Sequence, residues 1–184
     1  MSVEQSLEEG RTAEFVRYWL GQRPDLDPEA LALQLTIARL TIMSRRTLTR
    51  MAEAQGITAT DFQIMGVIKR GGEAGAPTRP SDLWKLFSLT PGAITYRINR
   101  LFEMGLVRRK ALSGDRRVIL LSLTSAGAAK VDAVMTGYSA LLDDKLTVVD
   151  AVPGGRKALM ELLRPLARAW EEGEESDAAG ELEA

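Results

Sequence analysis

The chain has 184 residues, of which 45% are hydrophobic and 27% charged, and its 24 basic and 25 acidic residues give a formal net charge of -1. This composition is typical of a soluble globular protein and excludes a disordered chain. Because the sequence contains no His and no Cys, it excludes imidazole or thiolate zinc sites, Ser-His and Cys-His nucleophile pairs, and disulfides.

Two helices are predicted in the N-terminal third. The first covers residues 11–20, and its apolar face carries Phe15, Val16, Trp19 and Leu20. The second covers residues 28–54, with Pro28 in its first turn and Gly56 just past its end. One apolar face of this long helix carries Leu31, Leu35, Ala38 and Ile42, and another carries Leu33, Ile37 and Leu40. A helix that is apolar on two sides favours burial between subunits.

Three shorter helices follow, with the spacing of a helix-turn-helix. Thr58 is expected to cap the first, which runs through Arg70 into the loop GGEAGAPTRP. Ser81 is expected to cap the second, and Thr90 the third, which has Pro91 in its first turn. The residues expected to face the core are Phe62, Ile64, Met65, Val67 and Ile68, then Leu83, Leu86 and Phe87, then Ile94, Ile98 and Leu101.

After Gly105 the pattern changes from helix to strand. Residues 106–112 and 118–123 predict two strands, and residues 113–116 predict the turn between them. A hairpin with a basic tip directly after a helix-turn-helix describes a wing.

Two more helices are predicted at the C-terminal end. Thr124 is expected to cap the first, over residues 125–146, and the second follows the breaker Pro153-Gly154-Gly155. The fold class is therefore mainly α with a small β-hairpin wing: a winged helix-turn-helix with a helical dimerisation lobe. The expected domains are N-terminal dimerisation helices at 1–56, the winged helix-turn-helix at 57–124, C-terminal dimerisation helices at 125–172 and an acidic disordered tail at 173–184.

The charge is distributed unevenly along the chain. Residues 171–184 carry seven acidic and no basic residues, and residues 1–31 carry seven acidic against three basic residues. Residues 79–117, in contrast, carry nine basic and three acidic residues, a local net charge of +6. A basic excess confined to the winged segment indicates a polyanionic partner.

The helix that follows Thr90 is the expected recognition helix, because the second helix of a helix-turn-helix lies in the major groove. Thr, Asn and Arg side chains can contact thymine, adenine and guanine edges. The candidate DNA-binding residues of this helix are Thr90, Pro91, Gly92, Thr95, Tyr96, Arg97, Asn99 and Arg100. The alternative for Arg100 is a structural ion pair.

The tip of the hairpin supplies a second set of candidates. Arg116, and after it Arg117, suits a narrow minor groove, where negative potential is concentrated. Asp115 is expected to pair with one of these arginines and fix its orientation. The alternative for the basic residues from Arg108 to Lys110 is solvation of an edge strand.

Three segments resemble the winged helix of the multiple antibiotic resistance regulator (MarR) family: TATDFQIMGVIKR, SDLWKLFSLTPGAITYRINRLFEMGLVRRK and SGDRRVILLSLTSAGAAKVD. The resemblance is most specific at Asp115-Arg116-Arg117 and Leu123-Thr124-x-x-Gly127. It implies a homodimer with interlocked terminal helices, a near-palindromic operator, and a small ligand between the two lobes that relieves repression. The chain has Tyr96 where many members have Arg and Gly92 where they have Ser, so the operator sequence cannot be transferred.

The extra N-terminal helix is similar to that of a branch that includes urate-responsive regulators. By that resemblance, Trp19 and Arg108 correspond to ligand-binding positions, while Gln63 replaces the carboxylate of the urate site. We therefore expect a small aromatic or phenolic anion near Trp19, Phe62, Gln63 and Arg108 instead of urate. The alternative for Trp19 is packing in the core.

The sequence thus predicts a sequence-specific, double-stranded DNA-binding transcriptional regulator, a ligand-responsive repressor that binds a palindromic operator as a homodimer. The alternative is a winged-helix module for protein or RNA contact without operator recognition. We expect no enzymatic activity, no cofactor and no metal, since the acidic residues do not converge. The N-terminus lacks a signal peptide and no apolar run reaches the roughly 20 residues that span a bilayer, so a cytoplasmic location is expected.

Overall fold

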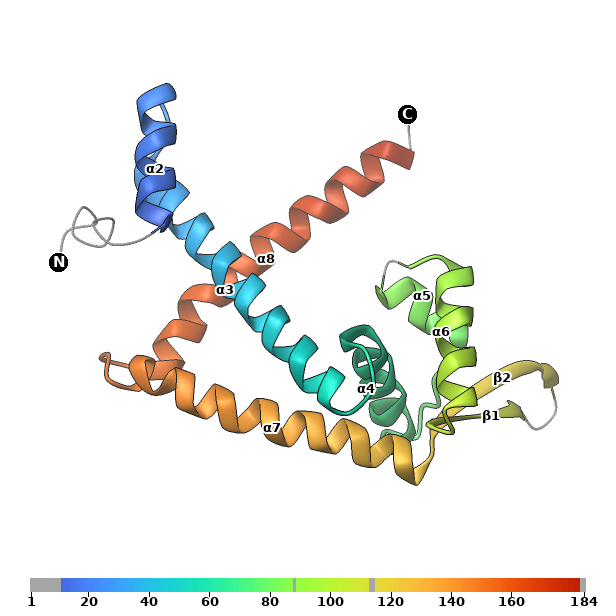
Figure 1. The fold of residues 1–184 in the computed structure, drawn as a ribbon. Helices are drawn as coiled ribbons and strands as arrows, with labels where there is room; N and C mark the ends of the chain where they lie inside the picture. Colours follow the sequence, from blue (N-terminus) through green and yellow to red (C-terminus); the bar gives the residue numbers. More distant parts are fainter. Residues whose placement is uncertain (1–10, 88, 113–114, 183–184) are drawn as a thin grey trace. The chain divides into compact units, whose positions relative to one another are not determined.

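The computed structural model describes residues 11–87, 89–112 and 115–182 (Figure 1). The side chains of residues 11–12, 115–117 and 173–182 are outside this description. The contacts divide the chain into two compact units, residues 1–135 and residues 136–184, and each is described by itself. The first unit contains the core of the molecule and every candidate site residue.

Helices α2 (Arg11–Gln22) and α3 (Pro28–Ala54) form where the sequence predicts them and pack against each other. The carboxylate of Asp27 caps α3 by accepting hydrogen bonds from the first backbone N–H groups of the helix. On the first apolar face of α3, Leu31, Leu35 and Ala38 are half-buried, but Ile42 is 51% exposed. On the second face Ile37 is half-buried, whereas Leu33 and Leu40 are 53% and 64% exposed, so neither face is fully covered within the described residues.

The buried face of α2 differs from the predicted one. Ala13 and Val16 are buried, whereas Phe15 and Trp19 are 47% and 39% exposed. The two aromatic residues, four positions apart, lie on another stripe of the helix and contact each other, with ring centroids 6.1 Å apart. Tyr18 meets Trp19 edge-on at 5.6 Å. Trp19 therefore packs within an exposed aromatic cluster and not in the core.

The winged segment starts with three helices, α4 (Ala59–Glu73), α5 (Pro80–Phe87) and α6 (Pro91–Glu103). Thr58 and Asp61 form a reciprocal capping box at the start of α4. The core side chains of these helices are Phe62, Ile64, Met65, Ile68, Leu83, Ile94, Ile98 and Leu101.

Two predictions about α5 are wrong. The helix begins at Pro80, so Ser81 lies inside its first turn, and the carboxylate of Asp82 accepts the Arg79 N–H at 2.8 Å instead. A short helix can bury only a narrow stripe, and here Leu83 occupies it. Leu86 is consequently 56% exposed, although the sequence pattern places it in the core.

The hairpin consists of β1 (Val107–Leu112) and β2 (Asp115–Leu123), paired antiparallel with Val107 opposite Leu123. β2 starts earlier than predicted, at Asp115, because the pairing continues to Leu112 beyond an irregularity. The predicted loop between α4 and α5 also contributes an isolated bridge. The backbone carbonyl of Thr78 accepts the Leu121 N–H at 2.9 Å, which adds a third short stretch to the hairpin.

Helix α7 (Ser125–Asp150) is fixed to the base of the wing by its first turn. The Thr124 hydroxyl accepts the Gly127 N–H at 3.0 Å and donates to the Gly105 carbonyl at 2.7 Å. A Cβ at Gly127 would lie 2.1 Å from the carbonyl oxygen of Leu106, so only glycine fits this approach.

The final helix α8 (Gly155–Leu182) continues through most of the segment for which the composition predicts a disordered tail. Glu, Ala and Leu are frequent in residues 171–184, and their high helix propensity accounts for the helical backbone. In the second unit the guanidinium of Arg156 binds Asp143 at 3.1 Å and Asp150 at 2.8 Å, across the turn between α7 and α8.

Candidate nucleic-acid interface

Helix α6 presents a polar surface beside the hairpin, and the first unit places both in contact (Figure 1). Thr90 caps the helix by accepting the Ala93 N–H at 3.2 Å. Thr90, Pro91, Gly92 and Thr95 are exposed, and Tyr96 is 70% exposed. Ile94, Ile98 and Leu101 hold the opposite side of the helix in the core, as predicted. The N-terminal half of α6 is therefore available to a partner.

Arg97 and Arg100 have a different environment from the other candidates. Nη1 of Arg97 lies 3.2 Å from Oδ1 of Asp61, and Nη1 of Arg100 lies 2.5 Å from Oδ2 of the same carboxylate. Asp61 is completely buried, whereas the side chains of Arg97 and Arg100 are 30% and 38% exposed. The alternative that the sequence offered for Arg100, a structural ion pair, is present, and Arg97 shares it.

Asn99 is connected to the wing. Its side-chain oxygen accepts a hydrogen bond from Nη2 of Arg109 on β1. The Arg109 guanidinium also lies 5.3 Å from the ring centroid of Phe102, within the range of a cation–π interaction. Arg109 reaches α6 because it pairs with Leu121, whose side chain is buried, and so lies on the inner face of the hairpin. Arg109 therefore links β1 to α6, in addition to being an exposed side chain on an edge strand.

The predicted tip residues Asp115, Arg116 and Arg117 lie at the start of β2, whose backbone is described. Their side chains lie outside the described part of the chain, so the proposed pairing of Asp115 with an arginine stays a prediction. Arg108 and Lys110 are exposed on β1 and alternate with Arg109, which places them on the outer face of the hairpin.

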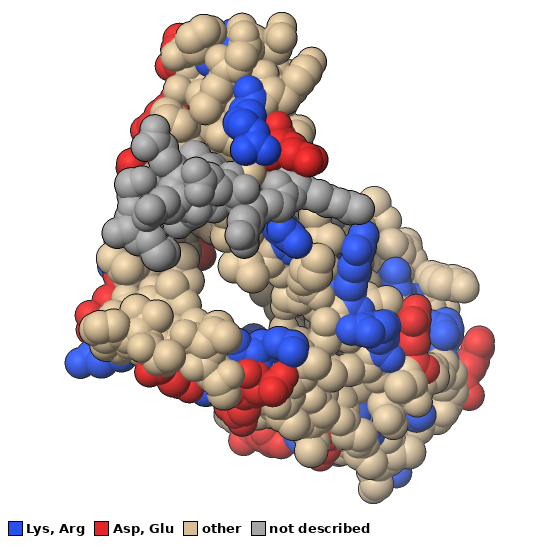
Figure 2. Space-filling model, turned by 60° about the vertical axis from the view of Figure 1, so that its left-hand side comes forward, with Lys and Arg blue, Asp and Glu red and all other residues tan. Residues whose placement is uncertain are grey.

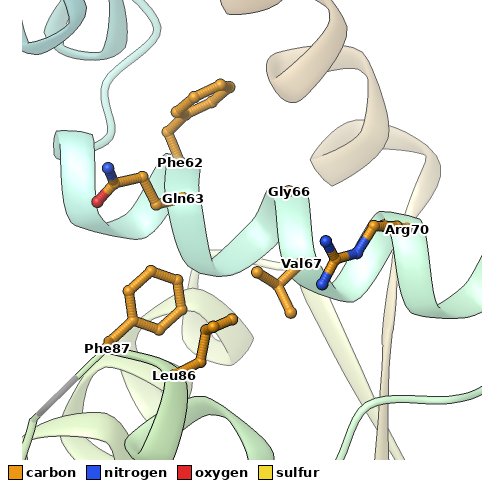
Figure 3. Close-up of a pocket in the computed structure, with 7 residues that line it drawn as sticks. All are labelled: Phe62, Gln63, Gly66, Val67, Arg70, Leu86 and Phe87. Atoms are coloured by element: carbon orange, nitrogen blue, oxygen red, sulfur yellow. The ribbon is translucent and has the colours of Figure 1, made fainter. Parts of the chain in front are cut away.

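A groove of about 420 Å³ lies between α4 and α5. Its walls are formed by Phe62, Gln63, Gly66, Val67, Arg70, Leu86 and Phe87. Figure 3 shows Leu86 and Phe87 extending from α5 toward the side of α4 that carries Gln63 and Val67, while the ring of Phe62 points to the other side of α4.

The groove contains half of the predicted ligand-binding set. Phe62 and Gln63 belong to its walls, but Trp19 and Arg108 do not. The cation in the groove is Arg70, one helical turn from Val67, and no pattern in the sequence distinguishes it from the other arginines. Leu86 and Phe87 were predicted only as part of the apolar face of α5, so their place in the wall of this groove was also missed.

Charge on the visible face in Figure 2 is mixed, with Lys and Arg side chains in several groups beside Asp and Glu. Within the described residues, no cluster of three or more Asp or Glu side chains has a metal-binding arrangement. None of the helices described here combines the length and the apolar character needed to cross a membrane.

The comparisons with known proteins agree on one family. The model of the MarR family matches residues 57–119. The chain is 29% identical over 123 residues to the HTH-type transcriptional regulator PecS of Dickeya dadantii, and this alignment covers 67% of this chain and 74% of that protein. It is 33% identical over 105 residues to the multiple antibiotic resistance protein MarR of Salmonella typhimurium, and this alignment covers 57% of this chain and 70% of that protein.

Solved structures give the same result. A mutant MarR from E. coli complexed with operator DNA is 27% identical and superimposes with a TM-score of 0.58, covering 77% of this chain and 98% of that chain.

Proposed function

The chain belongs to the MarR family, and on that premise we propose that it is a transcriptional regulator that binds double-stranded operator DNA as a homodimer and represses transcription. The observation that carries the proposal is the exposed polar surface of α6 beside a basic hairpin. In this assignment Gly92, Thr95 and Tyr96 face base edges in the major groove. Arg116 and Arg117 reach the adjacent minor groove, with Asp115 orienting them.

The role of the regulator is not catalytic, and we place its action in the cytoplasm. The solved complex of the E. coli relative with operator DNA supports the DNA-binding role, since that relative aligns over 77% of this chain.

A second copy of the chain is the partner that the exposed apolar residues favour. Leu40 on α3 is 64% exposed, Val148 near the end of α7 is 71% exposed, and Leu162 on α8 is 73% exposed. Exposed apolar side chains on these three helices are typical of an oligomer interface. A two-fold dimer would present two α6 helices to half-sites about 34–36 Å apart.

Selection of duplexes from a random library with the full chain tests the DNA-binding proposal. We expect near-palindromic sequences to be enriched, and their affinity to fall steeply with salt as counterions are released. Thr95→Ala and Tyr96→Ala should each relax the base preference at one position per half-site, while Arg116→Ala weakens binding. Equal affinity for selected and random duplexes would instead favour the protein or RNA contact module.

We further propose that the groove between α4 and α5 binds the effector, a small aromatic anion. Arg70 supplies a cation for a carboxylate, and Val67, Leu86 and Phe87 supply an apolar wall for a ring. Ligand binding there would act between α4, whose Asp61 binds two arginines of α6, and α5, which directly precedes α6 in the chain.

Calorimetric titration with salicylate as the probe separates this groove from the site that the resemblance implies. Arg70→Met should weaken binding at least fivefold, equivalent to about 1 kcal/mol or more, because a hydrogen bond to a charged group contributes about 1.5–3 kcal/mol. Trp19→Phe and Arg108→Met should leave it unchanged. The reverse pattern would place the effector at Trp19 and Arg108, and binding insensitive to all three variants would contradict both assignments.

A further inference from the structure

The carboxylate of Asp61 is the most buried charged group in the described part of the chain, with an exposed fraction of 0%. It lies in the first turn of α4, where Oδ2 accepts the backbone N–H of Thr58 at 3.1 Å. A buried carboxylate is tolerated only when it is paired and its remaining lone pairs are satisfied. The capping box satisfies part of this requirement, and the rest comes from α6.

Two guanidinium groups from α6 complete the environment of Asp61. Arg97 and Arg100 are three residues apart and therefore lie on the same side of the helix. Arg97 donates to Oδ1 at 3.2 Å and also approaches the Thr58 hydroxyl at 3.4 Å, while Arg100 donates to Oδ2 at 2.5 Å. Each oxygen of one carboxylate thus holds a different point on α6.

These contacts constrain α6 in a way that its apolar side cannot. Ile94, Ile98 and Leu101 bury the helix, but apolar packing is non-directional and tolerates small rotations of the helix about its axis. Charge-assisted hydrogen bonds are directional, and two of them to one fixed carboxylate define both the rotation and the axial position. Asp61 is itself held in place by the capping box with Thr58 at the start of α4, so the carboxylate that positions α6 is fixed in the core.

We propose that Asp61 is a positioning residue for operator recognition. It fixes the presentation of Thr95 and Tyr96 to DNA, and Arg97 and Arg100 act through it instead of contacting bases or phosphates. The proposal rests on the proposed function, because it concerns how α6 reads an operator. It removes two arginines from the set of DNA contacts and assigns operator specificity to an acidic residue on a different helix.

A positioning role and a phosphate contact have different signatures. Removal of a phosphate-binding side chain weakens binding to all sequences and lowers the salt slope by about 0.9 for each phosphate that is no longer neutralised. Misplacement of α6 weakens binding to the selected operator only, because non-specific affinity depends on charge and not on the alignment of base-reading side chains.

The experiment compares Asp61→Asn with wild type on the selected operator and on a random duplex of equal length at several salt concentrations. We expect at least a tenfold loss of operator affinity, random-duplex affinity within twofold of wild type, and an unchanged salt slope. Asp82→Asn is the matched control, since it makes the same change in the same segment at an exposed carboxylate that accepts the Arg79 N–H, which an asparagine oxygen can also accept. It should behave as wild type.

Arg97→Gln and Arg100→Gln test the second half of the proposal. If they act through Asp61, each should lower operator affinity with no change in slope, and each should have a smaller effect in the Asp61→Asn background than alone. A uniform loss on both duplexes with a lower slope would show direct phosphate contacts and overturn the proposal. Unchanged operator binding by Asp61→Asn would overturn it as well.

Hydrogen exchange of the protein without DNA provides a readout that does not depend on the operator. In Asp61→Asn the amides of α6 should exchange at least tenfold faster, while those in the first turns of α7 keep their wild-type rates. If Asp61→Asn does not fold, the pair Arg97→Lys and Arg100→Lys keeps the charge and loses the planar geometry, and it should show the same specific loss. Wild-type protein that does not distinguish the operator from random DNA would contradict the proposed function alone, whereas unchanged α6 exchange would contradict the role of Asp61.

Discussion

Arginines of the winged segment illustrate how residues of one type acquire separate roles. Arg97 and Arg100 bind the buried carboxylate of Asp61, whereas Arg109 lies over Phe102 and donates to Asn99. Each environment follows from the position of the residue on its element. Arg97 and Arg100 share one side of α6, whereas Arg109 lies on the inner face of the hairpin. Part of the local excess of positive charge is therefore already engaged in contacts within the chain.

The role of Arg109 leads to a prediction at the residue scale. Arg109→Lys keeps the charge but loses the planar group that contacts Phe102 and Asn99 at once. We expect operator affinity to fall about fivefold, equivalent to about 1 kcal/mol for a cation–π contact, because the wing is no longer fixed to α6. The salt slope should not change. Lys110→Arg, an equally conservative change on the outer face, should bind like wild type, and a loss of similar size there would contradict the link.

At the scale of elements, the junction between α6, the hairpin and α7 depends on one close backbone approach. Gly127 in the first turn of α7 lies against the carbonyl of Leu106, and Thr124 bridges both segments. A methyl group at this position must displace backbone, which is much less able to move aside than the end of a flexible side chain.

Gly127→Ala should therefore lower the free energy of unfolding by about 1–3 kcal/mol, the usual effect of overpacking. Gly72→Ala is the control, because a Cβ on this α4 glycine meets nothing within 4 Å. It should leave stability unchanged or raise it by up to about 1 kcal/mol through helix propensity. Chemical denaturation of both variants measures the difference. Equal stabilities would mean that α7 can shift away from Leu106 without penalty.

The elements themselves were largely predictable, because local signals determine them. Thr58 and Thr90 cap their helices as expected, and Gly105, with φ +68°, ends α6. The errors occur where a tertiary contact decides: β2 extends to Asp115 by pairing with β1, and Thr78 joins Leu121 from a segment with loop composition.

The exposed side of α6 that forms the candidate site could be predicted from the sequence, whereas the roles of individual residues could be predicted less well. Helical spacing identified the exposed side of α6, including Thr95 and Tyr96, from the core stripe alone. Spacing within one helix cannot show that Asp61, 36 residues before Arg97, meets it in space. The same limit explains why Arg70 and Phe87 were not assigned to one groove.

At the scale of the whole molecule, the positive charge presented to one operator and the apolar surface left exposed both depend on whether the chain is dimeric. The segment 79–117 carries a net charge of +6, and a dimer presents it twice to one operator. Acidic residues at both ends of the chain bring the total to -1, which limits non-specific binding to other polyanions. The ends and the centre therefore have opposite effects on DNA affinity, and only the assembled dimer combines two basic centres on one duplex.

The exposed apolar residues of α8 allow a test of this assembly. Leu162 is 73% exposed in the single chain, and burying one leucine side chain contributes about 1.5–3 kcal/mol. Leu162→Glu loses this contribution in both copies and places two charges at the interface, so the dimer should dissociate at concentrations at least a hundredfold higher than wild type in sedimentation measurements. Lys157→Glu on the same helix introduces the same side chain at an exposed polar position and should leave the dimer intact. Operator affinity should fall with dissociation, because a single α6 reads only one half-site. A Leu162→Glu dimer as stable as wild type would place the interface on α3 and α7 without this part of α8.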